Sequence, residues 1–309
     1  MSKTAFIFPG QGSQSVAMLA DLGAETMVRQ TFQEASGALG YDLWELIQRG
    51  PAEVLNSTDK TQPALLTSGV ALWRLWQQRG GARPDFLAGH SLGEYTALVC
   101  AGVFNLGDGV RLVEKRGQFM QQAVPAGTGA MAAILGLDDE QVRVACAAAA
   151  EGDVVEAVNL NAPGQVVIAG SVAAVERGIT ACKAAGAKRA MALPVSVPSH
   201  CALMKPAAEQ LAAVLAGMVL HAAELPVINN VDVAMETDSS QIRDALVRQL
   251  YSPVRWVETV QKLSAEGVIR AYECGPGKVL SGLVKRIDKD MTVFALENAD
   301  AFNQALGEV

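Results

Sequence analysis

The sequence is poor in the residues that disulfide frameworks and metal centres require. Its five cysteines are scattered along 309 residues, and no two form a Cys-x-x-Cys pair. An odd, scattered set of cysteines predicts reduced thiols in a cytoplasmic protein and argues against a disulfide-stapled fold or a zinc site. Histidines number only three, at positions 90, 200 and 221. We therefore expect no metal centre.

Long basic and long apolar runs are also missing. The net charge is −7 and no Lys/Arg-rich run is present, so nucleic-acid binding is not expected. No apolar run approaches the roughly 18 residues that span a bilayer. The apolar run at residues 4–8 is broken by Pro9-Gly10 and is too short for a secretory signal. We expect a soluble, intracellular protein that binds neither membranes nor nucleic acid.

The composition itself is typical of a well-packed α/β protein, with 50% apolar and 18% charged residues. The length allows a large core and a second, smaller domain. Between residues 126 and 198 the hydrophobic pattern predicts elements in the order β-α-β-β-α-β, which is the ferredoxin-like order. We therefore predict a discontinuous α/β domain at residues 1–125 and 199–309, with a ferredoxin-like domain inserted at residues 126–198.

The remaining segments are predicted to be largely helical. Residues 15–80 form helices with breaks at Gly40, Gly50-Pro51 and Thr61-Gln62-Pro63. A helix over residues 107–124 carries Arg116, and a lone arginine on a helix is typically a solvated surface charge. A long helix is predicted over residues 201–218, and an acidic tail is expected at the end of the chain.

The functional hypothesis begins from one segment, Gly89-His90-Ser91-Leu92-Gly93. It joins a short apolar strand to an Ala/Leu-rich helix and fits the Gly-x-Ser-x-Gly nucleophile elbow. The glycines let strand and helix pass closely, and the serine hydroxyl is exposed near the positive end of the helix, where an anion is stabilised. The other interpretation is a strand-to-helix turn with an N-capping serine. The pentapeptide alone does not decide between them.

A serine nucleophile needs a nearby base, because its free hydroxyl is scarcely ionised near neutrality. His221 follows a helix and looks structural, and the side chain of His90 is expected to leave the turn in a different direction from Ser91. His200 lies in a Pro-bounded loop that enters a helix, and the helix N-terminus would lower its pKa. His200 is therefore the best candidate for the base, with a structural histidine as the alternative.

Other glycine-containing motifs give little support to nucleotide binding. Gly10 and Gly12 resemble the start of a dinucleotide fingerprint, but Ser15 stands where the third glycine is required. Gly275-Pro276-Gly277-Lys278 lacks the full P-loop spacing. An α/β-hydrolase would need an acid between serine and histidine and a histidine near the chain end, yet 109 residues follow His200. Hydrolysis as chemistry stays open.

Seven segments in a fixed order nevertheless resemble the malonyl-CoA:acyl carrier protein transacylases of bacterial type II fatty acid synthesis, and the resemblance covers nearly the whole chain. The segments are Phe8–Gln14, Gly89–Tyr95, Glu114–Gly117, Asn159–Gln165, Val197–His200, Gln249–Trp256 and Gly275–Leu280. The resemblance implies a large α/β hydrolase-like domain with a ferredoxin-like insert, and an active site in the cleft between them.

The same resemblance implies roles for single residues. Ser91 matches the nucleophile, His200 the general acid and base, and Gln249 the residue whose main-chain carbonyl orients the histidine. The backbone N–H groups of Gln11 and Leu92 match the oxyanion hole.

Substrate recognition is implied in the same way. Arg116 matches the residue that grips the malonyl carboxylate, a task suited to a guanidinium because its fixed fork makes two parallel hydrogen bonds. Asn161 is assigned to substrate binding. This implied role replaces the interpretation of Arg116 as a solvated surface charge.

The activity that the resemblance implies is ping-pong acyl transfer. A malonyl group passes from malonyl-CoA to Ser91 and then to the phosphopantetheine thiol of acyl carrier protein, which supplies fatty acid elongation. No metal or redox cofactor is required. The alternatives are a malonyltransferase of a malonate decarboxylase or polyketide system, a serine thioesterase, and a non-catalytic subunit that binds carrier protein.

The negative charge of the expected partner, acyl carrier protein, restricts where it can bind this chain. Carrier proteins of this system are acidic, and this chain is also net acidic, so binding requires a local basic patch. Lys188 and Arg189 begin the predicted strand that leads to Val197–His200. We expect these two residues to form a carrier-protein patch on the rim of the cleft; the alternative is a pair of ordinary solvated charges.

Overall fold

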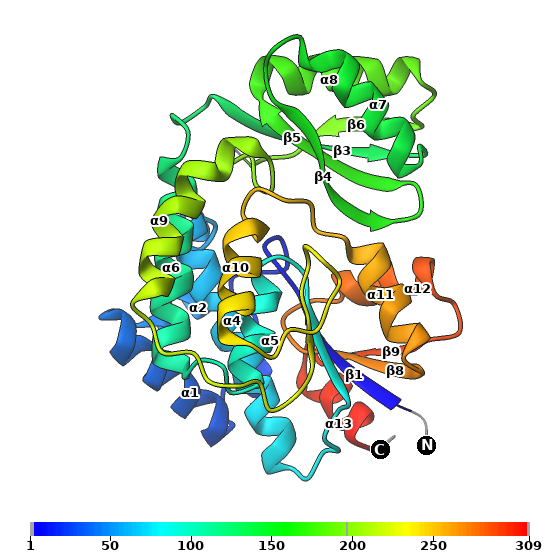
Figure 1. Ribbon diagram of the computed structural model, residues 1–309. Helices are drawn as coiled ribbons and strands as arrows, with labels where there is room; N and C mark the ends of the chain where they lie inside the picture. Colours follow the sequence, from blue (N-terminus) through cyan, green and yellow to red (C-terminus); the bar gives the residue numbers. More distant parts are fainter. Residues whose placement is uncertain (1–2, 196, 308–309) are drawn as a thin grey trace.

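A computed structural model describes residues 3–195 and 197–307 and shows two sheets stacked along the molecule (Figure 1). The larger sheet has the strand order β7-β2-β1-β8-β9, and all of its pairs are parallel. Its strands are β1 (Lys3–Phe8), β2 (Phe86–Gly89), β7 (Val227–Ile228), β8 (Val268–Glu273) and β9 (Thr292–Ala295). The mixed α/β class predicted from composition is confirmed.

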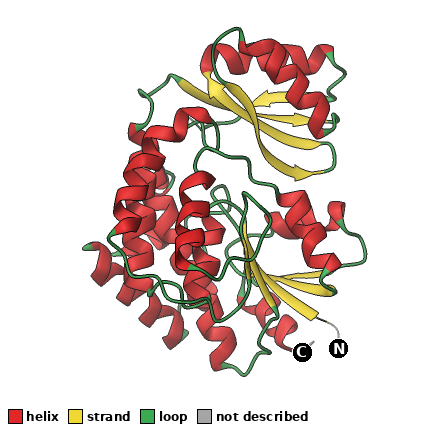
Figure 2. Ribbon diagram, viewed as in Figure 1, coloured by secondary structure: helices red, strands yellow, loops and turns green. Residues whose placement is uncertain are grey.

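Helices cover both faces of the parallel sheet (Figure 2), as a sheet of buried parallel strands requires. Successive residues of β1 face opposite sides, so Phe6 and Phe8 enter one apolar cluster while Ala5 and Ile7 enter the other. The first cluster also contains residues of α1 (Thr26–Leu39), α2 (Leu43–Arg49), α3 (Ala52–Leu55), α4 (Thr58–Gln78), α5 (Leu92–Cys100), α6 (Leu106–Gln122), α9 (Lys205–Ala216), α10 (Ser239–Gln249) and α13 (Ala299–Gly307). The second face packs against α11 (Trp256–Ala265) and α12 (Val279–Ile287).

The smaller sheet is antiparallel, with the strand order β4-β5-β3-β6. Its elements are β3 (Gly129–Leu135), α7 (Asp139–Ala150), β4 (Val155–Ala162), β5 (Gln165–Ser171), α8 (Val172–Ala184) and β6 (Arg189–Ala192). This is the β-α-β-β-α-β order predicted from the hydrophobic pattern, which is confirmed. The two helices pack on one face of the sheet and form an apolar cluster of their own.

A backbone connection between the sheets fixes the smaller one above the larger. Val254, in the loop before α11, donates to the carbonyl of Val158 at 2.8 Å and accepts from Leu160 at 3.0 Å. Both partners belong to β4. The edge of the small sheet is thus held over the carboxyl ends of the parallel strands, where α/β proteins build their sites.

Three local predictions are wrong. The break expected at Thr61-Gln62-Pro63 does not occur, since α4 continues through Pro63. Nearly every residue in the first four turns of α4 is buried, so tertiary packing outweighs the hydrogen bond that proline cannot make. The helix expected over residues 201–218 is a short 3₁₀ turn (Ala202–Met204) followed by α9, and the expected tail contains α13.

Candidate active site

Ser91 occupies a sharp turn between β2 and α5. Its backbone lies at φ 51° and ψ −108°, a strained conformation for a residue that is not glycine. The glycines on either side permit the crossing. A Cβ at position 89 would lie 1.9 Å from the carbonyl carbon of Gly93, and one at position 93 would lie 2.0 Å from the oxygen of Phe8. The prediction that these two glycines allow strand and helix to pass closely is confirmed.

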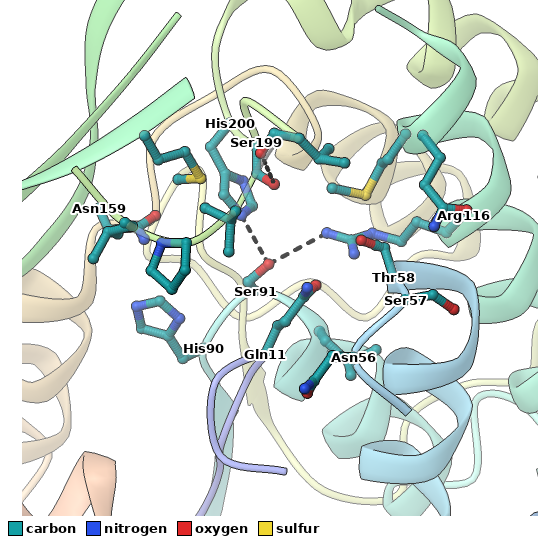
Figure 3. A pocket seen from close by; sticks show the side chains of 18 residues that line it. Gln11, Asn56, Ser57, Thr58, His90, Ser91, Arg116, Asn159, Ser199 and His200 are labelled. Carbon is teal, nitrogen blue, oxygen red and sulfur yellow. Dashed lines mark hydrogen bonds between the residues drawn. The ribbon is translucent and has the colours of Figure 1, made fainter. Parts of the chain in front are cut away.

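The side chain of Ser91 meets that of His200, 109 residues further along the chain (Figure 3). The distance from Ser91 Oγ to His200 Nε2 is 2.8 Å, and His200 Nδ1 lies 2.8 Å from the carbonyl oxygen of Gln249. A carbonyl oxygen can only accept, so Nδ1 carries the proton and Nε2 presents its lone pair to the serine hydroxyl. This is the tautomer that a general base requires.

Burial holds His200 in its neutral form. The side chain is 3% exposed, and burial, followed by the positive charge of Arg116, lowers the pKa of His200 to about 3. The hydrogen bond to Gln249 acts in the opposite direction. The helix N-terminus expected to lower this pKa is not the cause: α9 begins at Lys205, beyond an intervening 3₁₀ turn.

Arg116 lies next to the serine and is almost fully buried, with 1% of its surface exposed. Its Nη2 donates to Ser91 Oγ at 3.3 Å and to Gln249 Oε1 at 3.0 Å, while Nη1 donates to Gln62 Oε1 at 2.8 Å. The solvated surface charge suggested by helix position alone is therefore wrong. A guanidinium held in this way by neutral oxygens keeps its charge available to an acid.

These side chains open into a pocket of about 290 Å³ between the two sheets (Figure 3). Its floor comes from the large sheet and includes Gln11, His90, Ser91 and Leu92. The backbone N–H groups of Gln11 and Leu92 donate to no protein acceptor among the described residues, so both remain available to a ligand. The small sheet and its exit loop supply apolar side chains, namely Met131, Leu193, Pro194, Val195 and Val197.

Comparisons with known proteins agree with this geometry. The family model described as acyl transferase domain matches residues 5–285. A malonyl CoA-acyl carrier protein transacylase of Salmonella typhimurium is 64% identical, with 99% of each chain covered, and its counterpart in Bacillus subtilis is 47% identical, with 99% of this chain and 97% of the other covered. The chain belongs to this acyl transferase family.

Solved structures of family members share the whole architecture. An acyl carrier protein S-malonyltransferase from Vibrio cholerae superposes with a TM-score of 0.96 at 62% identity, covering 98% of this chain and 99% of the other. A malonyl-transacylase solved in complex with a type II polyketide acyl-carrier protein gives a TM-score of 0.99 at 57% identity, and both chains are fully covered.

Two predicted groups of residues do not belong to the described residues that line the pocket. Among the described residues that line it, the structure places Asn159 rather than Asn161. The Oδ1 of Asn161 instead lies 2.8 Å from His90 Nε2, and burial lowers the pKa of that histidine. Lys188 and Arg189 are exposed, but Lys188 is five residues before Leu193, or about 16 Å along an extended strand.

Three further residues of the site were not identified from the sequence. Gln62 holds Arg116, Glu94 accepts from Gln249, and Asn230 accepts from the backbone N–H of Ser91. Glu94 belongs to the elbow segment that was singled out, and Gln62 to the segment interpreted as a helix break. A buried polar residue in a helix was the available signal, but burial is not visible in the sequence.

The described part of the chain contains no cluster of three or more His, Cys, Asp or Glu side chains arranged to hold a metal ion. None of the helices in the described residues combines the length and apolarity needed to cross a bilayer.

Proposed function

We propose that this protein transfers malonyl groups from malonyl-CoA to the phosphopantetheine thiol of acyl carrier protein, through a malonyl ester on Ser91. The observation that carries the proposal is the position of Ser91 Oγ, 2.8 Å from His200 Nε2 and 3.3 Å from Arg116 Nη2. A nucleophile, a neutral base and a buried cation thus meet at one point. The names of the most similar relatives support the choice of malonyl-CoA and acyl carrier protein.

The first half-reaction follows from the geometry. His200 Nε2 takes the hydroxyl proton as Ser91 Oγ attacks the thioester carbonyl carbon. The oxyanion that forms is stabilised by the free N–H groups of Gln11 and Leu92, and losing one such donor typically costs about 10²–10³ in rate. Collapse of the tetrahedral intermediate breaks the carbon–sulfur bond, and His200 returns its proton to the departing CoA sulfur.

The second half-reaction runs the same steps in reverse order with a different thiol. His200 takes the proton of the phosphopantetheine thiol, whose sulfur attacks the ester carbonyl of malonyl-Ser91. The intermediate collapses, and the proton passes to Ser91 Oγ. Side chains and backbone groups account for every proton and charge, so the proposal calls for no resident cofactor.

The length of the malonyl group suits the position of Arg116. Its carboxylate carbon and its thioester carbonyl carbon are separated by one methylene, which places them about 2.5 Å apart. When Ser91 Oγ attacks the carbonyl, the carboxylate therefore lies within reach of a guanidinium that already touches Oγ. An arginine fork binds such a carboxylate through two hydrogen bonds.

The proposal also covers the division of the chain into domains and its cellular compartment. We interpret residues 1–125 and 199–309 as a hydrolase-like catalytic domain and residues 126–198 as a ferredoxin-like insert that roofs the pocket. The antiparallel order β4-β5-β3-β6 and the separate apolar cluster of the small sheet support this division. The five free cysteines suit a reducing compartment such as the cytoplasm.

A second candidate is the same transfer to a carrier protein of a polyketide pathway. It is favoured by one of the most similar solved structures, which is described as a malonyl-transacylase with a type II polyketide acyl-carrier protein. The chemistry at Ser91 would be identical, so the identity of the acceptor alone distinguishes the two.

One experiment tests the proposal and its rivals together. The protein is incubated with malonyl-CoA, the mass of the intact chain is measured, and the acylated residue is located by peptide mapping. Holo-acyl carrier protein from a fatty acid or a polyketide system, or buffer alone, is then added. We expect Ser91 to carry a malonyl group that is stable in buffer and discharged by carrier protein. Rapid loss to water would indicate a thioesterase, and no labelling would indicate a non-catalytic subunit.

A further inference from the structure

Glu94 is a buried carboxylate to which the mechanism above gives no role. It lies in the first turn of α5, three residues after the nucleophile, and is 2% exposed. Its Oε2 accepts from the backbone N–H of Asn230 at 2.8 Å and from Gln249 Nε2 at 2.8 Å. Both donors are uncharged amides. Burying a carboxylate with only neutral partners is costly, so its presence at this position calls for a specific explanation.

We propose that Glu94 is a positioning residue that orients the carboxamide of Gln249 and, through it, fixes Arg116 for recognition of the acyl carboxylate. This inference rests on the proposed function, because it concerns selection of malonyl over neutral acyl groups at the same site.

The hydrogen bonds of Gln249 permit only one orientation of its side chain. Nε2 donates to Glu94 and also to the carbonyl of Ser91 at 3.0 Å, so both of its hydrogens are used. Oε1 is then turned toward Arg116 Nη2 at 3.0 Å. A carboxylate only accepts and a guanidinium only donates. A flipped amide would place its NH₂ group against the arginine and its oxygen against the glutamate, so both contacts would be lost.

Gln249 also connects this arrangement to the base. Its main-chain oxygen holds His200 Nδ1, while its side-chain oxygen holds Arg116. The main-chain oxygen is fixed by α10, whereas the side chain depends on Glu94 for its orientation. Loss of Glu94 should therefore disturb the arginine more than the histidine.

The second partner of Glu94 supports the nucleophile elbow. Asn230 donates its backbone N–H to Glu94, accepts from the N–H of Ser91 at 2.7 Å and donates from Nδ2 to the carbonyl of Gly89 at 2.7 Å. One carboxylate oxygen of Glu94 thus accepts from Asn230, which stabilises the elbow, and from Gln249, which contacts Arg116.

Two substitutions distinguish the effect of the length of the Glu94 side chain from the effect of its negative charge. Glu94→Asp keeps the charge but withdraws the carboxylate by one methylene, so it no longer reaches Gln249. Glu94→Gln keeps an acceptor oxygen at the same distance and removes the charge. The matched control is Glu273→Asp. Glu273 is also fully buried, and it accepts from the N–H groups of Leu280 and Ser281 at the start of α12.

The readout is the ratio of kcat/KM for malonyl-CoA to that for acetyl-CoA, measured on soluble, folded protein. For Glu94→Asp we expect the ratio to fall roughly 10- to 100-fold, the scale of a small misplacement at a site. Glu94→Gln should keep the ratio within about threefold of wild type, because the hydrogen bonds persist. Glu273→Asp should lower the melting temperature without moving the ratio. An unchanged ratio in Glu94→Asp overturns the proposal.

Coupling through Gln249 provides a test that does not depend on the folding of one variant. Gln249→Met removes the carboxamide and should itself lower the ratio; if it does not, the proposal fails even where Glu94→Asp is insoluble. In the Gln249→Met background, Glu94→Asp should lower the ratio no further, because residues that act through one contact are not additive. A further loss of similar size would contradict the inference.

Failure of the inference is distinguishable from failure of the proposed function. If wild type forms no malonyl-Ser91, the function is wrong, and the position of Arg116 in a crystal structure of Glu94→Asp or Gln249→Met still tests the inference. Displacement of the guanidinium supports the positioning role, and an unmoved guanidinium overturns it.

Discussion

The Nη2 atom of Arg116 lies 3.3 Å from the Oγ of Ser91, although Arg116 belongs to α6 and Ser91 lies in the turn before α5. The cation that would bind an acyl carboxylate is therefore in contact with the atom that would attack the acyl carbonyl. A malonyl group, in which carboxylate and carbonyl are one methylene apart, fits both contacts, whereas a neutral acyl group has no partner for the guanidinium. Under the proposed function, selectivity and reactivity therefore depend on the same few atoms.

Replacement of Arg116 should shift the selectivity of the enzyme from malonyl groups toward neutral acyl groups. For Arg116→Ala we expect kcat/KM with malonyl-CoA to fall roughly 10²–10³-fold, the scale of losing a buried charge contact, and transfer of acetyl groups to rise relative to malonyl. Arg116→Lys should recover only part of the loss, because an ammonium lacks the planar fork. Competition between malonyl-CoA and acetyl-CoA for Ser91, followed by intact mass, measures the change. Retained malonyl selectivity in Arg116→Ala would show that the role is misassigned.

The glycines of the elbow should be indispensable for stability. Gly93→Ala would place a methyl group 2.0 Å from the backbone oxygen of Phe8, and such overpacking costs about 1–3 kcal/mol or more. Gly282→Ala is the matched control, because a Cβ there meets nothing within 4 Å. The control should be about 0.4–1 kcal/mol more stable than wild type. Urea unfolding of the two variants gives both values, and equal stabilities would contradict the steric argument.

Acylation of Ser91 should be insensitive to pH through the range in which an ordinary histidine titrates. Because burial and Arg116 lower the pKa of His200 to about 3, the base stays neutral as the pH falls through 6.5. We expect kcat/KM for self-malonylation at pH 5.5 to stay within about twofold of its value at pH 7.5. The Glu94→Gln variant is measured alongside wild type, because burial raises the pKa of Glu94 to about 7, within the pH range of the experiment. The variant removes this second titrating group from the site. A half-maximal rate near pH 6.5 in both proteins would refute the assignment.

Glu94 should make the stability of the fold depend on pH. Burial raises the pKa of Glu94 from 4.5 to about 7, although the hydrogen bonds from Gln249 and Asn230 and the charge of Arg116 act in the opposite direction. The folded state therefore binds this proton more tightly than the unfolded chain, so the contribution of Glu94 is fully present below pH 4.5 and is lost as the pH rises through 7. Relative to wild type, Glu94→Gln should gain about 3 kcal/mol in free energy of unfolding between pH 4 and pH 8. A difference that stays constant with pH would disprove it.

Charge reversal at the proposed carrier-protein patch should separate the two half-reactions. We expect Lys188→Glu with Arg189→Glu to raise the apparent KM for acyl carrier protein and to leave self-malonylation from malonyl-CoA unchanged, because screened surface charges act over about 8–10 Å. Arg49→Glu with Arg111→Glu, on α2 and α6, changes the net charge equally and serves as the control. Equal damage to both half-reactions, or equal effects of the two double variants, would reject the patch.

Local sequence was sufficient to predict the elements whose structure depends on near neighbours. The crossing of β2 and α5 needs only Gly89 and Gly93, which have no Cβ to collide with the backbone, so the sharp turn at Ser91 follows from five residues. The order of elements in the small sheet was predictable for the same reason, since the period of apolar residues distinguishes each strand from each helix.

Tertiary structure alone decided burial and partnership. Arg116 has the sequence context of a surface residue, yet Gln62 and Gln249 from two other helices enclose it. The pKa of His200 is set by burial and a neighbouring cation rather than by the helix that follows it. Pro63 continues a helix because that helix is packed on several sides, and Glu94 gains its partners from segments more than 130 residues away. Such properties depend on the free energy of contacts between distant segments, which exist only once the chain has folded.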